Sequence, residues 1–240
     1  MRRIAVFVEG QTELIIVREL LFKKFHYNVD LICQELWRDE YRHAEYDNPC
    51  PDATFHYLIV NVGNDNRVLS VIMRNEKTMI EKGYERIIGL RDMYSQEYKE
   101  LTTEINTHII EAKRQAALDY IKSNSKNPPL IFFNFAIMET EAWFLAINHL
   151  LERINPILTY EFICKNTGHD LELVDPEKTF PCPADILAEI YKLIGANYDK
   201  HRGDIEKLAK VTDIEHYDSL YDSNKCASFK PFYESLLLAS

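Results

Sequence analysis

Carboxylate side chains follow three apolar segments of the sequence, at the points where strands would end. Glu9 follows the run RIAVFV at residues 3–8, Asp92 lies in the segment 85–94, and Glu139 and Glu141 follow LIFFNFAIM at residues 130–138. Continuous apolar runs of this kind are typical of strands buried on both faces of a parallel sheet. Ligands of open α/β sheets bind outside the carboxyl ends of the strands, so we expect these acids to meet at one edge.

Carboxylates gathered in one cleft repel each other unless a cation joins them. Mg²⁺, or Mn²⁺ in its place, prefers hard oxygen ligands and leaves coordination positions for water and phosphate. Glu9, Asp92 and Glu141 are therefore the predicted metal ligands, and Glu139 joins them as a candidate catalytic residue. In regular structure Glu139 and Glu141 would not point the same way, so one of them should be the better ligand. Lys200 and Arg202 are interpreted as solvent-facing.

The elements that must position these acids alternate along the first part of the chain. Strands are predicted at residues 3–8, 55–65, 85–94 and 130–138, and helices at 13–25, 67–83, 97–122 and 139–154, with Thr12 as the N-cap of the first helix and a long polar loop at 38–54. This order favours an α/β fold, a mostly parallel four-stranded sheet flanked by helices. Shorter helices are predicted at residues 184–195, 203–210 and 229–238. Residues 1–155 should form the α/β core, and residues 156–240 a mainly helical part packed on it.

Composition narrows the class of protein. The chain has 240 residues, 5 cysteines and a formal net charge of −10. The charge argues against broad binding of a nucleic-acid backbone, which depends on Lys and Arg. The cysteines are scattered without a C-x-x-C pair, which disfavours zinc and indicates a reducing compartment. No stretch has the length of a membrane helix, so we expect a cytoplasmic protein with no membrane partner.

Four segments resemble a known family. VFVEGQTE at residues 6–13 resembles the opening motif of Toprim domains, especially those of the OLD-type nucleases and their relatives in bacterial anti-phage defence. GLRDMYS resembles the Toprim strand that ends Asp-x-Asp, with Tyr94 where the second aspartate is expected. AIMETEAWFLA resembles a Glu-x-Glu-Ala motif of a Toprim-like family of bacterial proteins. NYDKHRGD and KCASFKPFYESL resemble the closing segments of that family.

The resemblance implies a Toprim-like fold with Glu9 as the Toprim glutamate and Asp92 as the first aspartate of the pair. It further implies an Mg²⁺-dependent nuclease that cleaves DNA or RNA, working in phage defence. The alternative is a non-catalytic Toprim-like module that partners a separate ATPase, a reading favoured by Tyr94 and by the acidic charge. A weaker third reading is a phosphatase or nucleotidyl transferase with a small substrate. Whether the chain forms a homo-oligomer is left open.

Overall fold

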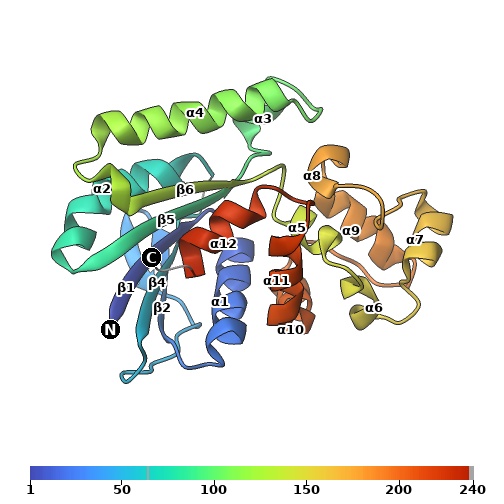
Figure 1. The fold of residues 1–240 in the computed structure, drawn as a ribbon, viewed down its shortest axis with the longest axis horizontal. Helices are drawn as coiled ribbons and strands as arrows, with labels where there is room; N and C mark the ends of the chain where they lie inside the picture. The colour runs from blue at the N-terminus through green and yellow to red at the C-terminus, as the bar shows by residue number, and fades with distance from the viewer. Residues whose placement is uncertain (64, 238–240) are drawn as a thin grey trace. The chain divides into compact units, whose positions relative to one another are not determined.

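The α/β class is confirmed by the computed structural model, which describes residues 1–63 and 65–237 (Figure 1). The described chain divides into two compact units. The first contains residues 1–91, 107–135 and the C-terminal residues from 234, and the second contains residues 92–106 and 136–233. The predicted division into residues 1–155 and 156–240 stays a prediction.

A six-stranded sheet forms the first unit, in the order β3-β2-β4-β1-β5-β6. Its strands are β1 (Arg2–Val8), β2 (Asp30–Trp37), β3 (Glu40–His43), β4 (Phe55–Asn61), β5 (Tyr84–Asp92) and β6 (Ile131–Ala136). The central strand β1 pairs in parallel with β4 and β5, and β4 pairs in parallel with β2. The last residues of β5 and β6 belong to the second unit. All four predicted strands exist, but the predicted count of four is wrong.

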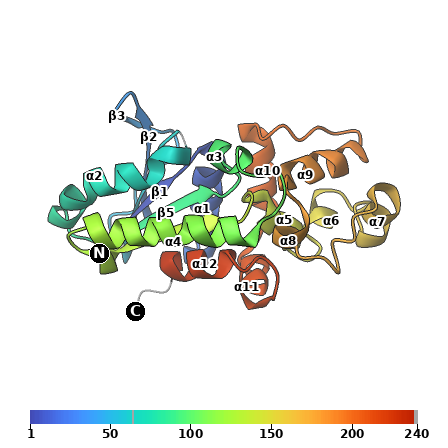
Figure 2. The same ribbon diagram turned by 90° about the horizontal axis from the view of Figure 1, so that it is seen from above.

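The two missed strands form a hairpin at the edge of the sheet (Figure 2). β3 is antiparallel to β2 and lies inside the segment that was predicted to be a loop. Its turn consists of Arg38 and Asp39, whose φ values are 47° and 65°. Such turns usually carry Asn or Gly because both central residues need positive φ. Arg-Asp therefore gave no hairpin signal.

Helices cover both faces of this sheet (Figure 1). On one face, α2 (Val68–Glu81) and α4 (Thr107–Asn124) pack on a core that includes Phe7, Val60 and Ile87. On the other face lies α1 (Gln11–Phe25), whose residues Leu14 to Val17 are buried. The N-cap of α1 is Gly10 and not Thr12. The Gly10 amide donates to Glu13 Oε2 at 2.9 Å, so Glu13 acts as a first-turn acid of the helix.

Two long predicted helices are each broken in the structure. The predicted helix 97–122 consists of α3 (Gln96–Lys99) and α4, because the Tyr98 hydroxyl donates to Glu104 O and accepts from Asn106 N in the connecting loop. The predicted helix 139–154 consists of α5 (Glu141–Ala146) and α6 (Leu150–Ile154). His149, with a φ of 56°, separates them.

The second unit is mainly helical. Besides α3, α5 and α6 it holds α7 (Tyr160–Thr167), α8 (Pro176–Thr179), α9 (Pro183–Lys192), α10 (Arg202–Val211), α11 (Ile214–Asp222) and the start of α12 (Phe229–Leu237). The three predicted short helices correspond to α9, α10 and α12. Trp143 of α5 stacks on Phe232 and meets the edge of Phe229, which fixes α5 against α12. None of the helices in the described ranges is both long and apolar enough to cross a membrane.

Candidate metal centre

Three of the predicted acids lie together in the second unit. Asp92, Glu139 and Glu141 each offer one carboxylate oxygen, and these oxygens lie within 4.8 Å of one another. Asp92 ends β5, and its Oδ1 accepts a hydrogen bond of 3.0 Å from the Thr140 amide. That bond joins the end of β5 to the turn that follows β6. The carboxylates thus meet because two chain segments are held at a common point.

The turn between β6 and α5 explains why Glu139 and Glu141 share one site. We predicted that these two side chains would not point the same way, and that prediction assumed regular structure. Met138 has a φ of 64°, in the left-handed region. The backbone therefore changes direction just before Glu139, and both carboxylates reach the same place.

Glu141 is the most buried member of the cluster, with no solvent exposure. Its Oε1 accepts a hydrogen bond of 2.9 Å from the Tyr198 hydroxyl. Its Oε2 is buried and has no hydrogen-bond partner among the described residues. Burial raises the pKa of Glu141, and the nearby charge of Lys200 opposes that rise. A buried carboxylate oxygen without a donor is costly unless a positive group meets it.

Lys200 supplies positive charge to the cluster. Its Nζ lies 2.8 Å from Glu139 Oε1 and 3.2 Å from Glu141 Oε1. Burial alone would lower the pKa of Lys200, but the carboxylates of Glu141 and Glu139 raise it above its ordinary value, so the amine stays charged. The Lys200 side chain is exposed, as predicted, but its amine also pairs with both carboxylates, which the sequence did not indicate. Arg202 pairs with Glu206 on the surface of α10.

Glu139 also contacts the first turn of a helix. Its Oε2 accepts a hydrogen bond of 3.0 Å from the Ala184 amide at the start of α9. Unpaired amides and the helix dipole make this a favourable place for negative charge. Glu139 is thus satisfied on both oxygens, by Lys200 and by α9. The oxygen without a donor belongs to Glu141, which makes Glu141 the better candidate for a metal ligand.

Tyr94 takes no anionic part in the cluster. Its hydrogen bond with Cys182, together with burial, raises the pKa of Tyr94 to about 12. The phenol is therefore neutral at physiological pH and is a poor ligand for Mg²⁺. The ring instead lies edge-on to Tyr98 and beneath the amine of Lys99.

Glu9 directly follows β1 and lies in the first unit, whereas the three clustered acids lie in the second. Its predicted role in metal binding stays a prediction. Sequence reasoning missed Tyr198 and Thr140, which hold Glu141 and Asp92 in place. Each lies far along the chain from the carboxylate that it contacts, so no short spacing in the sequence indicates the pair. Only the resemblance of the segment NYDKHRGD drew attention to the neighbourhood of Lys200.

The donor set fits a small divalent cation. It consists of carboxylate oxygens, the ligand type that Mg²⁺ and Mn²⁺ prefer, and includes the buried Glu141 Oε2 without a donor. No histidine or cysteine belongs to the cluster, which argues against zinc.

Comparison with known proteins adds little to this geometry. No protein family model matches the sequence, and no curated protein matches it. One solved structure is similar, the C-terminal region of the OLD protein of Xanthomonas campestris pv. campestris, with a TM-score of 0.41 and 13% sequence identity. The match covers 98% of this chain and 95% of that one.

Proposed function

We propose that the chain is an Mg²⁺- or Mn²⁺-dependent nuclease that hydrolyses phosphodiester bonds of DNA or RNA. The observation that carries the proposal is the cluster of Asp92, Glu139 and Glu141. Within it, the buried Oε2 of Glu141 accepts no hydrogen bond from any described residue. The motif resemblance to Toprim domains and OLD-type nucleases agrees with it, and the assignment to phage defence depends on that resemblance alone.

The residues of the cluster have separate roles in this proposal. Asp92 and Glu141 hold the cation, and Tyr198 and Thr140 keep these two carboxylates in position. A bound divalent cation polarises a phosphate oxygen and lowers the pKa of its water. Lys200, whose side chain is 37% exposed, offers hydrogen-bond donors to a phosphate oxygen that approaches the cluster. Glu139 fixes the Lys200 amine and the start of α9.

A second candidate function is a non-catalytic module that acts beside a separate ATPase. Two observations favour it. Lys200 already provides a counter-charge for two of the carboxylates, and a neutral phenol stands at Tyr94 where the resemblance expects an acid. In this alternative the cluster is a buried ion-pair network whose role is to fix α5, α9 and the segment around residue 200.

Metal binding followed by nuclease assays separates the two. Calorimetry with Mg²⁺ and Mn²⁺ should give binding for the wild type and its loss for Asp92→Asn and Glu141→Gln. The matched control is Glu161→Gln, an exposed acid on α7 that lies outside the cluster. Glu9→Gln tests the predicted role of Glu9 on its own. The same proteins are then assayed on single- and double-stranded DNA and on RNA.

The outcomes are distinct. Cleavage that requires the metal and is lost with Asp92→Asn, but not with Glu161→Gln, supports the nuclease. Hydrolysis of small phosphate esters without cleavage of nucleic acid favours a phosphatase. A wild type that binds no divalent cation, even with nucleic acid present, excludes the nuclease and leaves the non-catalytic module.

A further inference from the structure

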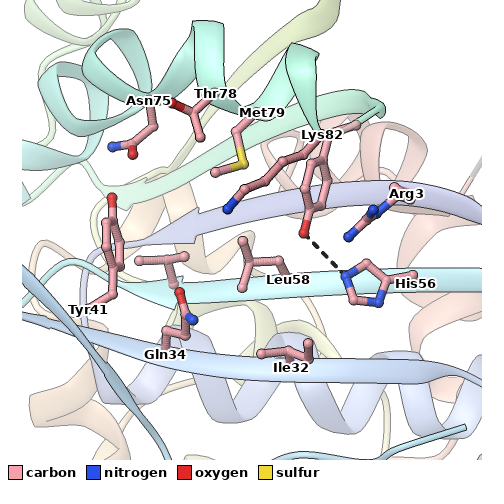
Figure 3. A pocket seen from close by; sticks show the side chains of 12 residues that line it. Arg3, Ile32, Gln34, Tyr41, His56, Leu58, Asn75, Thr78, Met79 and Lys82 are labelled. Atoms are coloured by element: carbon pink, nitrogen blue, oxygen red, sulfur yellow. Dashed lines mark hydrogen bonds between the residues drawn. The ribbon is translucent and has the colours of Figure 1, made fainter.

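A cavity that shares no residue with the acidic cluster lies wholly within the first unit. It has a volume of about 700 Å³ and lies between helix α2 and the strands beneath it (Figure 3). Sites for small ligands have volumes of this order, about 300–1,000 Å³. A packing defect in a core is far smaller, since interiors are close-packed. The cavity is therefore large enough for a ligand of drug or nucleotide size.

The charge of its lining is opposite to that of the chain. Arg3 and Lys82 line the cavity, and no Asp or Glu does. In a chain with a net charge of −10, a cationic lining without a carboxylate is unexpected from composition. The Nε of Arg3 is buried and has no hydrogen-bond partner among the described residues. Lys82 forms no ion pair with any of the described residues, and its amine extends over the cavity in Figure 3.

At the cationic end of the cavity, Arg3 packs against an aromatic ring. The Arg3 guanidinium lies 4.9 Å from the centre of the Tyr84 ring. The Tyr84 hydroxyl lies 3.2 Å from His56 Nε2, and His56 Nδ1 lies 2.5 Å from Asp30 Oδ2. With its proton on Nδ1, facing Asp30, the imidazole accepts the Tyr84 hydroxyl at Nε2. Asp30 thereby orients the ring from behind and is not part of the lining.

The rest of the cavity is apolar in the middle and polar at the far end. Ile32 and Leu58 form its floor, and Met79 of α2 lies above them (Figure 3). Beyond them, away from Arg3, lie the amides of Gln34 and Asn75 and the hydroxyl of Tyr41. A flat ring fits between a methionine and apolar strand residues, and side-chain amides recognise the donor and acceptor edge of a base.

We propose that this cavity binds a nucleoside monophosphate, with the phosphate at Arg3 and Lys82 and the base between Met79 and Leu58. The guanidinium of Arg3 and the ammonium of Lys82 offer charged hydrogen-bond donors to a phosphate. Gln34 and Asn75 contact the edge of the base. The site goes beyond the proposed nuclease function and does not depend on it, because none of its residues belongs to the acidic cluster.

The test is calorimetric titration of the full chain with AMP, GMP, CMP and UMP in EDTA, which removes any contribution of a metal site. Inorganic phosphate and adenosine are titrated as partial ligands. We expect at least one monophosphate to bind more tightly than either partial ligand. Lys82→Gln should weaken it by about tenfold or more, the range for a hydrogen bond to a charged group, and Lys82→Arg should restore part of the loss.

The matched control is Lys77→Gln, which removes the same charge from an exposed position of α2, the helix that Lys82 caps, outside the lining. Asp92→Asn should also leave nucleotide affinity unchanged. No binding of any of the four nucleotides at millimolar concentration would overturn the proposal. Equal affinity for inorganic phosphate, or equal weakening by Lys77→Gln and Lys82→Gln, would overturn it as well.

Discussion

The clearest test of the acidic cluster is to remove its lysine. Lys200→Met keeps a long side chain but takes away the positive charge that lies 2.8 Å from Glu139 and 3.2 Å from Glu141. Glu141 is fully buried, so its carboxylate cannot turn to bulk water. In EDTA, the variant should therefore be less stable than the wild type.

The size of the loss follows from the exposure of the partners. Breaking a fully buried ion pair costs about 3–5 kcal/mol, and an exposed pair contributes about 0.2–1 kcal/mol. Lys200 is 37% exposed while Glu139 is 14% exposed, which places the pair between these limits. We expect Lys200→Met to lower the free energy of unfolding by about 2 kcal/mol in EDTA.

A divalent cation should reverse that loss. A ligand that binds only the native state stabilises it by about 2.7 kcal/mol when its concentration is 100 times its dissociation constant. Without the lysine, the carboxylates should bind Mg²⁺ more tightly, so Mg²⁺ should stabilise Lys200→Met more than it stabilises the wild type. The assay is urea unfolding followed by circular dichroism, in EDTA and in Mg²⁺ at constant ionic strength.

Lys207→Met, at an exposed position of α10, is the matched control and should change little. Two results would refute the reasoning. Equal stability of Lys200→Met and the wild type in EDTA would mean that the lysine does not neutralise the cluster. A destabilised variant that Mg²⁺ fails to stabilise would mean that the carboxylates do not bind the cation.

Two further predictions concern stability. Burial raises the pKa of Glu177 from 4.5 to about 7, against the hydrogen bonds from Ser228 and Trp143. The native state therefore keeps a proton that the unfolded chain has released, and stability should fall by about 3 kcal/mol as the pH rises through this interval. Glu177→Gln should lose that slope, and urea unfolding at pH 5 and pH 8 would show it; an unchanged slope would contradict the assignment. Gly89→Ala would place a Cβ 2.5 Å from the Phe133 ring and should cost about 1–3 kcal/mol. Gly203→Ala, where a Cβ meets nothing within 4 Å, is its control, and thermal unfolding that ranks the two variants equally would refute the packing argument.

The central strands could be predicted because burial on both faces leaves a continuous apolar run. Val6, Phe7 and Val8 of β1 are fully buried, and their type alone indicates a strand. The edge of the sheet gave a weaker signal. β2 alternates between buried and half-exposed residues, and its turn uses Arg38 and Asp39 with positive φ, which no local pattern indicates.

The grouping of three of the four predicted acids could be predicted from the positions of the strand ends. Asp92, Glu139 and Glu141 follow strands, and the rule about strand ends brings such residues together. Tyr198 and Lys200 lie far along the chain, in a segment without periodicity, and only tertiary structure places them. The prediction that the side chains of Glu139 and Glu141 would point in different directions was wrong. It assumed regular backbone geometry, whereas Met138 has a left-handed conformation.

The net charge of −10 is a poor guide to what this chain binds, because the charges are unevenly placed. In the second unit, Lys200 partly neutralises a cluster of buried acids, so these acids repel a phosphate less than their number suggests. In the first unit, a cavity carries Arg3 and Lys82 and no carboxylate. Local electrostatic potential, and not the net charge of the chain, decides which anions approach.

The two sites should respond in opposite ways to solution conditions. EDTA should abolish binding at the acidic cluster and leave the cavity intact, whereas high salt should weaken the phosphate contacts at the exposed Lys82 most strongly.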